Sequence, residues 1–320
     1  MHNLQSLDKS VFTQGFMKRQ YSYYIILAII NMSGLILSVG IFFITDSILI
    51  LILGLAFLTF FRVQIGFLGH DLAHDQVFKN RKYNRFFGYL SGTLIMGVSH
   101  GFWRSTHNAH HDHTNQGDND PDFPFLRDAE FFKSFPGGVF ILRNIHLLFF
   151  PSFMLGYYMY IVQSLQFIFT KITAVKIYEL FLLIVNFIAY ASLFIVTMGV
   201  TQGIIFLLLH FVFIGIYMGI SFAPNHLGME EIQEDETYER YFQIITSRNL
   251  YPGFLVNYIF GGLNYQIEHH LYQTMPRKNY PEVAKIVKQY CTENNIPYRE
   301  TTFLGSYKEI YASLKEFSKS

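Results

Sequence analysis

The sequence is poor in cysteine and in charged residues, and each shortage excludes a class of protein. Cys291 is the single cysteine among 320 residues, so the chain by itself forms no intrachain disulfide and no iron–sulfur or zinc–thiolate site. Charged residues make up 15% of the chain, against about 25% in soluble domains, and hydrophobic residues make up 51%. This composition predicts a membrane protein. A net charge of +1 gives no indication of a nucleic-acid partner, so none is expected.

Four apolar stretches are long enough to cross a bilayer, which takes about 20 residues in a helix. The run between Gln20 and Thr45 carries no charge, the second stretch carries only Arg62, and residues 180–229 carry none. Gly199 and Gly203 are expected to mark the turn that divides this last run in two. The predicted spans lie near residues 23–43, 47–69, 180–197 and 202–223. We expect Arg62 to reach toward the membrane surface, as long basic side chains commonly do.

The distribution of lysine and arginine predicts the orientation of the spans. The two short turns 44–46 and 198–201 contain neither residue, whereas the other connections are basic. Because basic loops stay in the cytoplasm, we predict that both termini are cytoplasmic, together with residues 70–179 and 224–320. No repeat or long low-complexity run divides the sequence, which favours a single domain over residues 1–320.

Two further apolar stretches, 86–103 and 144–170, are interpreted as interfacial or re-entrant helices. Four glycines interrupt the first stretch, and Pro151 and Gly156 are expected to break the second. A single crossing by either would place histidine-rich segments on opposite membrane faces; a fifth span at 144–170 is the alternative. The predicted fold is an all-α integral membrane protein with four transmembrane helices, a cytoplasmic helical cap that holds a metal site, and interfacial helices.

Seven of the 13 histidines fall into three clusters. The clusters are His70 and His74; His107, His110 and His111; and His269 and His270. Spacings of three and four residues place side chains on one face of a helix. Imidazole suits iron, copper, zinc and nickel, and seven such ligands are too many for one ion. The clusters therefore predict a site for two metal ions.

Several residues beside the clusters are candidates for the same site. His226 follows the fourth span, and Gln266 stands three residues before His269, where the second cluster has a histidine. Metal-bound histidine commonly donates its second N–H to a carboxylate or another acceptor, so Asp71, Asn225 and Glu268 are candidate acceptors.

Other polar residues keep two interpretations each. Asp118, Asp120 and Asp122 form either a turn that caps a helix or a wall of the metal site. His210 lies in the middle of a span, where an ionisable residue is a functional candidate. We favour a hydrogen bond from His210 to a neighbouring helix.

The three clusters resemble the three histidine boxes of membrane fatty acid desaturases. The box-like sequences are HDLAH at residues 70–74, HNAHH at 107–111 and QIEHH at 266–270. Glutamine at the start of the third box resembles the front-end branch, which inserts a double bond between an existing one and the carboxyl end. Residues 101–103, 119–122, 271–277 and 296–301 also resemble that branch. The resemblance extends from about the first span to the C-terminus.

The resemblance implies a two-iron centre, with dioxygen as co-substrate, that makes a cis double bond in a long acyl chain. Its ligands would be His70, His74, His107, His110, His111, His226, His269 and His270. Relatives with three complete boxes have a histidine at the position of Gln266, which here would bind weakly through its oxygen or hold a water. The acyl chain would be carried on coenzyme A, a carrier protein or a lipid.

The resemblance also bears on the source of electrons. Many eukaryotic front-end members carry an N-terminal cytochrome b-type domain, and about 20 residues before the first span leave no room for one in this sequence. A separate donor is therefore expected, such as a ferredoxin or a b-type cytochrome with its reductase. Four basic residues form a candidate docking surface, with an ordinary solvated surface as the alternative: Arg277, Lys278, Lys285 and Lys288.

Two other functions remain open at this point. The same metal site would serve a hydroxylase, epoxygenase or ketolase that acts on an alkyl or isoprenoid chain. A membrane metal transporter or a zinc-dependent hydrolase is a third interpretation. A transporter should place ionisable ligands deep in its spans, and only Arg62 and His210 lie there.

Overall fold

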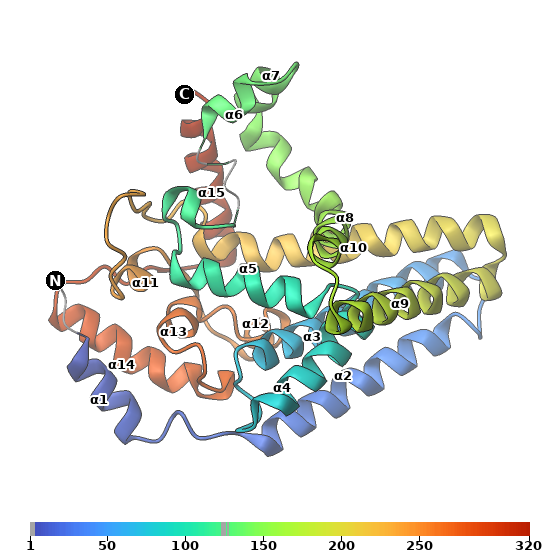
Figure 1. Ribbon diagram of the computed structural model, residues 1–320, viewed down its shortest axis with the longest axis horizontal. Coiled ribbons are helices and arrows are strands. Elements are labelled where there is room, and N and C mark those ends of the chain that lie inside the picture. Colours follow the sequence, from blue (N-terminus) through green and yellow to red (C-terminus); the bar gives the residue numbers. More distant parts are fainter. Residues whose placement is uncertain (1–3, 123–125, 127) are drawn as a thin grey trace. The chain divides into compact units, whose positions relative to one another are not determined.

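The computed structural model describes residues 4–122, 126 and 128–320, and this part of the chain is largely helical (Figure 1). The longer helices are α2 (Tyr21–Ile41), α3 (Ile48–Ala73), α5 (His100–Asp112), α8 (Ile145–Thr170), α9 (Ala174–Met198), α10 (Val200–His226), α14 (Tyr280–Glu293) and α15 (Phe303–Phe317). The shorter elements are α1 (Gln5–Thr13), α4 (Arg81–Gly88), the π-helix η1 (Tyr89–Met96), η2 (Gly117–Asn119), α6 (Ala129–Lys133), α7 (Gly138–Arg143), α11 (Phe242–Ile245), β1 (Asn249–Leu250), α12 (Phe254–Ile259), α13 (Gln266–Leu271), η4 (Arg277–Asn279) and β2 (Glu300–Thr301).

The chain forms two compact units, and each is assembled from segments that are distant in sequence. The first unit comprises Met1–Lys18, Ser105–Ser152 and Ile220–Ser320. The second unit comprises Arg19–Arg104 and Phe153–Gly219. The long helices α5, α8 and α10 each contribute residues to both units.

Among the described residues, five helices are long and apolar enough to cross a membrane: α2, α3, α8, α9 and α10. The prediction of a helical membrane protein is confirmed, and each of the four expected spans is a single helix. The turn between α9 and α10 lies at Gly199 (φ +80°), whereas Gly203 lies inside α10 against the backbone of Ile195. The stretch 86–103 divides into α4, η1 and α5, none of which is a candidate span.

Helix α8 corrects one expectation about the 144–170 stretch. Pro151 and Gly156 do not break it, because α8 runs without interruption for 26 residues. A membrane-embedded helix tolerates proline where neighbouring helices and side chains satisfy the freed backbone groups. Gly156 instead permits close packing, since it lies opposite Gly215 of α10. The 144–170 stretch is therefore a fifth helix of spanning length.

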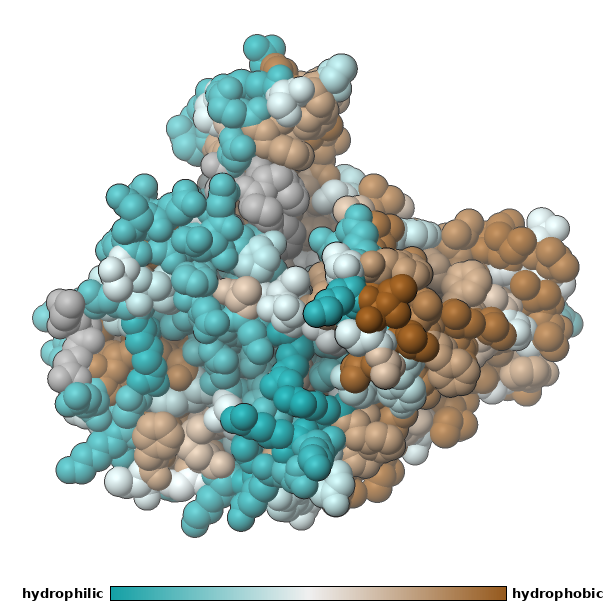
Figure 2. All heavy atoms as spheres, in the orientation of Figure 1, coloured by the Kyte–Doolittle hydropathy of each residue, from teal (hydrophilic) through white to brown (hydrophobic). Residues whose placement is uncertain are grey.

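In the second unit, glycines allow the long helices to pack closely. A Cβ atom on Gly34 of α2 would lie 2.3 Å from the Phe61 ring of α3. The outward faces of these helices are apolar, and side chains such as Ile29 (60% exposed) and Leu37 (73% exposed) cover them. Figure 2 shows hydrophobic residues along these long helices. Such a surface suits contact with lipid rather than water.

The expectation that Arg62 reaches the membrane surface is wrong. Arg62 is fully buried in α3, and its guanidinium lies within the second unit. Its hydrogen-bonding partners follow it by 33 to 148 positions in the sequence, so no local sequence pattern predicts them. His210 is one of these partners, at 3.4 Å, as the favoured interpretation of that residue predicted.

The first unit has its own hydrophobic core, which fixes the short helix α13. Leu7 and Val11 of α1 pack with Ile267 of α13 and with Val283 and Val287 of α14. The strands β1 and β2 pair in parallel, Asn249 opposite Glu300, beside this core. Helix α13 is too short to be stable alone, so this packing is what holds it in place.

Candidate metal centre

Helix α5 presents its three histidines on one face, as their spacing predicted. The rings of His107 and His111 lie one turn apart, with their Nε2 atoms 3.1 Å from each other. The rings of His107 and His110 are stacked 5.8 Å apart. One helix thus contributes three imidazoles to a single location.

Helices α10 and α13 bring three more histidines to α5 within the first unit. The ring of His111 lies 4.7 Å from that of His269 and 4.0 Å from that of His270. The ring of His226 lies 4.7 Å from His110 and 4.5 Å from His270. We call these six residues the histidine cluster: His107, His110, His111, His226, His269 and His270.

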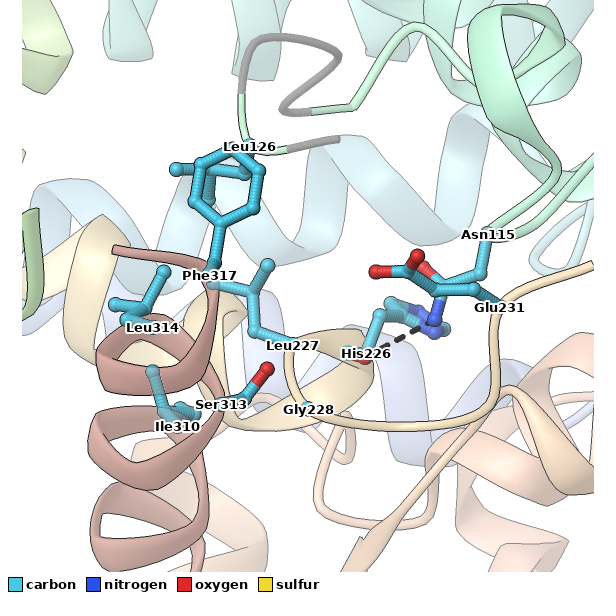
Figure 3. A pocket seen from close by; sticks show the side chains of 10 residues that line it. All are labelled: Asn115, Leu126, His226, Leu227, Gly228, Glu231, Ile310, Ser313, Leu314 and Phe317. Atoms are coloured by element: carbon cyan, nitrogen blue, oxygen red, sulfur yellow. Dashed lines mark hydrogen bonds between the residues drawn. The ribbon is translucent and has the colours of Figure 1, made fainter. Parts of the chain in front are cut away.

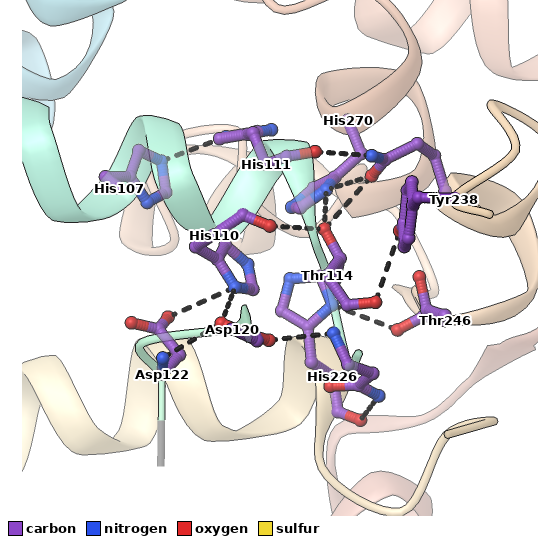
Figure 4. Close-up of polar contacts among 12 residues, drawn as sticks. His107, His110, His111, Thr114, Asp120, Asp122, His226, Tyr238, Thr246 and His270 are labelled. Carbon is purple, nitrogen blue, oxygen red and sulfur yellow. Dashed lines mark hydrogen bonds and ion pairs between the residues drawn. The ribbon is translucent and has the colours of Figure 1, made fainter. Parts of the chain in front are cut away.

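The hydrogen bonds of the cluster suit histidines that bind metal (Figure 4). Four of the rings use Nδ1 to contact an oxygen of the protein. The contacts are His110 with Asp120 Oδ1 at 2.9 Å, His226 with Thr246 O at 3.0 Å, His269 with Tyr280 Oη at 3.1 Å, and His270 with Gln243 Oε1 at 2.6 Å. A carboxylate or carbonyl oxygen can only accept, so in His110, His226 and His270 Nδ1 carries the proton and Nε2 keeps the lone pair.

The arrangement of these nitrogens fits a cation. In each of two groups the ligand nitrogens lie within 4.8 Å of one another: His110, His226 and His270, and His111, His269 and His270. Basic nitrogens gathered at such distances repel one another, and a bound cation relieves that repulsion. An all-nitrogen set of this kind suits a transition metal such as iron, zinc or copper.

The sequence left two interpretations of Asp120, as part of a turn or as part of the metal site, and the structure shows contacts of both kinds. One carboxylate oxygen contacts His110 Nδ1, and the other accepts the Asn115 backbone N–H at 2.7 Å. Asp120 is fully buried. Asp122 lies farther from His110 Nδ1, at 3.6 Å, and is partly exposed. The short sequence after the second histidine cluster therefore supplies a carboxylate that orients a candidate ligand.

Sequence reasoning missed several partners of the cluster. Gln243 accepts from His270 and donates its amide N–H to the backbone oxygen of His111 at 2.5 Å. Thr114 Oγ1 lies 3.1 Å from His270 Nδ1, and Thr246 holds His226 through its backbone oxygen. The residues around Gln243 and Thr246 follow no recognisable motif, so only the fold reveals them.

Gln266 lies beside the cluster in α13. Its amide nitrogen is 2.9 Å from His226 Nε2, and it is buried. Its Oε1 has no hydrogen-bond partner within the described part of the chain. Rotation about the last side-chain bond exchanges the nitrogen and oxygen, and would turn the oxygen toward the histidines.

Glu268 hydrogen-bonds Asn249 and Tyr298 rather than a histidine. The buried Glu268 carboxylate accepts from Asn249 Nδ2 at 2.8 Å and from the Tyr298 hydroxyl at 3.0 Å, while Asn249 Oδ1 accepts the Ile267 N–H. Burial raises the pKa of Glu268 to about 7. Glu268 thus fastens α13 to β1. Among the described residues, the Asn225 side chain forms no hydrogen bond with a histidine.

The buried Arg248 fixes the end of α10, where His226 lies. Its guanidinium donates to the backbone oxygens of Pro224 at 2.8 Å and Leu227 at 3.0 Å, and pairs with Glu309 at 2.8 Å. Pro224 lies in the last turn of α10 and Leu227 directly follows the helix, where intrahelical donors run out. Arg248 therefore holds the position of His226 without touching it.

The remaining two candidate ligands belong to the second unit. His70 and His74 lie buried at the end of α3, with ring centroids 4.7 Å apart. The Trp103 ring lies 5.2 Å from His70, and Asp71 Oδ1 lies 3.3 Å from His70 Nδ1. The spacing of four residues places both rings on one side of the helix end, as predicted.

A pocket reaches His226 from the side of α15 (Figure 3). Ile310, Leu314 and Phe317 form its apolar wall, and Asn115 and Glu231 its polar one. An acyl chain requires an apolar lining throughout, because a carboxylate would lose hydration against methylene groups. This pocket therefore suits water or a small polar molecule better than an acyl chain.

Three of the four basic residues proposed for donor docking are either buried or paired with an acid. Arg277 is buried, and one of its nitrogens donates to the Gly261 backbone oxygen. Lys285 pairs with Glu282 at 2.8 Å, and Lys288 pairs with Glu300 at 2.6 Å. The acidic partners reduce the local positive charge that an acidic protein would recognise.

Comparisons with known proteins agree with this geometry. A family model described as fatty acid desaturase matches residues 46–302. The chain is 32% identical over 268 residues to the Delta(5) fatty acid desaturase fat-4 of Caenorhabditis elegans, covering 77% of this chain and 59% of that protein. It is 28% identical to the Delta(6)-fatty-acid desaturase fat-3 of the same organism (100% and 75% covered) and 30% identical to the Delta(8)-fatty-acid desaturase of Euglena gracilis (79% and 66% covered). The chain thus spans less than two thirds of the first and third of these relatives.

Proposed function

Because the chain belongs to the fatty acid desaturase family, we propose that it introduces a cis double bond into a long acyl chain, at a position typical of front-end enzymes. The similarity to Delta(5), Delta(6) and Delta(8) desaturases supports this assignment. The observation that carries the proposal is the cluster of six histidines, four of which direct Nδ1 to a protein oxygen.

The metal ligands proposed are the six histidines of the cluster together with His70 and His74. Two bound iron ions would supply the activation of dioxygen that removal of hydrogen from an unactivated methylene pair needs. Overall, two hydrogen atoms leave the acyl chain, two electrons and two protons arrive from outside, and dioxygen leaves as two waters. Gln266 would contribute its amide oxygen, weakly or through a water.

The protein's own contribution is to orient the ligands and to shield them. Asp120, Thr246 and Gln243 fix the tautomer and the ring plane of three histidines, and Tyr280 fixes the ring plane of His269. The cluster is largely buried, which strengthens every electrostatic contact within it. A methylene group offers no polar handle, so the choice of bond must depend on how the acyl chain is positioned.

We propose four membrane spans, α2, α3, α9 and α10, in one domain with both termini and the histidine segments on the cytoplasmic side. Helix α8 has the lowest mean hydropathy of the five long helices, which supports an interfacial or re-entrant placement. A cysteine that replaces the exposed Lys171, just after α8, should react with an impermeant reagent from the same side as one that replaces the exposed Lys133, before α8, each in a Cys291→Ser background. Reaction from opposite sides would make α8 a complete span.

The electrons are proposed to come from a separate ferredoxin, or from a b-type cytochrome with its reductase. The acyl chain is proposed to be bound to coenzyme A, a carrier protein or a lipid. Purified enzyme, supplied with each donor and each acyl form in turn, would identify the pair that supports turnover. Reduction of the enzyme by the donor before acyl addition separates electron transfer from substrate choice.

The function is tested by expression in a host without polyunsaturated lipids, fed defined acyl chains. We expect new double bonds on the carboxyl side of an existing one, located by mass spectrometry. The matched control is His113→Ala, because His113 binds Gln116 outside the cluster and should be dispensable. Iron-loaded protein that yields only hydroxylated chains, or no product from any chain, would overturn the proposal.

A further inference from the structure

The chain turns sharply between η1 and α5, in the second unit, at residues 97–99. Gly97 adopts a left-handed conformation (φ +79°) there. Such a turn leaves carbonyls at the end of η1 and N–H groups at the start of α5 without helical partners. Because η1 packs on the candidate spans α3 and α9, these groups must be satisfied by the protein.

Arg62 of α3 satisfies the carbonyl end. Its Nε donates to Ile95 O and its Nη2 to Met96 O, each at 2.9 Å. Its Nη1 lies 3.4 Å from His210 Nδ1, and the Tyr190 ring faces the guanidinium at 3.9 Å. Within the described residues Arg62 forms no ion pair, so a buried cation is compensated by backbone oxygens and an aromatic ring.

Side chains of helices α8 and α9 also bind carbonyls at the end of η1. The Tyr157 hydroxyl of α8 lies 2.7 Å from Met96 O, and the Asn186 amide of α9 donates to Leu94 O at 2.8 Å. Only glycine fits at position 97, because a Cβ atom there would lie 2.4 Å from Tyr157 Oη and 2.6 Å from Asn186 Oδ1. The end of η1 is thus enclosed by side chains from three helices.

Glu179 of α9 satisfies the amide end. Its carboxylate accepts the Gly101 N–H at 2.8 Å and the Ser99 hydroxyl at 3.0 Å. The Ser99 hydroxyl in turn accepts the Phe102 N–H at 3.1 Å, as a helix cap does. Glu179 is 1% exposed and forms no ion pair among the described residues.

The two preceding N–H groups are also satisfied by side chains. The Ser99 N–H donates to Ser164 Oγ and the His100 N–H to Thr93 Oγ1, both at 3.0 Å. We call this environment of residues 94–102 the polar seat. Its charged members, Arg62 and Glu179, do not neutralise each other. The cation lies at the negative end of η1 and the anion at the positive end of α5, as helix dipoles favour.

We propose that Arg62 and Glu179 are positioning residues that set where α5 begins and how it is rotated. His107, the first histidine of that helix's cluster, follows Ser99 by eight residues, or about 12 Å of helix axis. A shift of one residue at the start of α5 would rotate its histidine face by about 100°. The effect on turnover rests on the proposed function, whereas the placement of α5 does not.

Trp103 reports this placement directly, because it is the single tryptophan and lies in the first turn of α5. We expect Glu179→Ala and Arg62→Met to shift its emission to longer wavelength and to increase acrylamide quenching, in metal-free protein below its unfolding temperature. Desaturation should fall about 10- to 100-fold in kcat, since small displacements of reacting groups have effects of that size. KM should change less than about twofold, because Arg62 and Glu179 hydrogen-bond the protein's own backbone.

Conservative substitutions of the two charged residues should have different effects. Glu179→Gln keeps an oxygen for the Gly101 N–H and should recover most of the wild-type emission and kcat. Arg62→Lys should not recover the wild-type emission or kcat, because an ammonium group lacks the fork geometry with which a guanidinium binds two carbonyls. The matched control is Ser38→Ala, which removes a buried hydroxyl of α2 that bonds within its own helix, to Gly34 O.

Wild-type emission and turnover in both Glu179→Ala and Arg62→Met would overturn the proposal, as would equal losses in Ser38→Ala. If Glu179→Ala does not accumulate in the membrane, Glu179→Asp, one methylene shorter, provides the same comparison. The fluorescence needs neither metal nor substrate. A Trp103 shift in a protein whose wild type desaturates nothing would therefore support the role of the polar seat and overturn only the proposed function.

Discussion

The histidine cluster of the first unit and the polar seat of the second both bury many polar groups, but the groups are paired in one network and not in the other. In the polar seat, donors meet acceptors: Arg62 donates to carbonyls and Glu179 accepts N–H groups. In the histidine cluster, protein oxygens hold one side of the rings while nitrogens gather on the other, within 4.8 Å in each group. A network whose members satisfy one another specifies structure, whereas one that gathers like groups calls for a ligand.

The sharpest test of this comparison is to remove a nitrogen from the cluster. We expect His107→Ala and His270→Ala to abolish desaturation to below detection while the protein stays in the membrane. Iron per chain, measured by mass spectrometry, should fall in both. Retained activity would remove the substituted residue from the ligand set, and His113→Ala should match the wild type.

The polar seat should be sensitive to acid through His100. Burial, together with the charges of Arg104 and Arg85, lowers the pKa of His100 to about 4. The unfolded chain, with a pKa near 6.5, binds more protons, so this stability is complete above pH 6.5 and is lost as the pH falls toward 4. This difference between the two pKa values corresponds to about 3 kcal/mol in the free energy of unfolding.

His100→Gln should therefore flatten the dependence of the free energy of unfolding on pH between 6.5 and 4. Metal-free protein in detergent, followed by thermal unfolding at several pH values, gives that slope. His146→Gln serves as the control, since His146 is only partly buried. An unchanged slope in His100→Gln would show that His100 is not the group that titrates.

Asp120 links the two kinds of network, because it satisfies a backbone N–H and also orients a candidate ligand. Asp120→Asn keeps an acceptor for His110 but loses the charge that makes the imidazole more basic. We expect iron affinity to fall about 10- to 100-fold. Titration of metal-free protein with ferrous ion measures this, with the exposed Asp118→Asn as control. Equal affinities in the two variants would assign Asp120 to the turn alone.

The smallest expected effect comes from a neutral member of the polar seat. Asn186→Leu removes donors to Leu94 O and Ile95 O, but Arg62 still serves Ile95 O. The free energy of unfolding should decrease by about 1–2 kcal/mol, with iron content unchanged. A loss of iron without a loss of stability would mean that the two networks are coupled more tightly than their hydrogen bonds indicate.

The same contrast explains what the sequence can predict. Histidine spacing is a local property, so the sequence HNAHH alone places three imidazoles on one face of α5. Apolar length likewise predicts α2, α3, α9 and α10. Partners that come from distant residues are not predictable in this way: Gln243 lies 27 residues from His270, and Asn186 lies 124 from Arg62. Arg62 is expected at the surface on sequence grounds because long basic side chains commonly reach there, and its actual partners lie 33 to 148 residues away.

The burial of Arg62 also has a consequence for biosynthesis. Tyr157, Asn186 and His210 follow it by 95, 124 and 148 residues, so the ribosome makes the second hydrophobic helix well before these partners exist. At about 5–20 residues per second, the delay is on the order of ten seconds. During that time the insertion machinery, or a local thinning of the lipid, must accommodate a lone cation. Shortened nascent chains should therefore leave the second helix poorly inserted until the codons for α9 and α10 have been read.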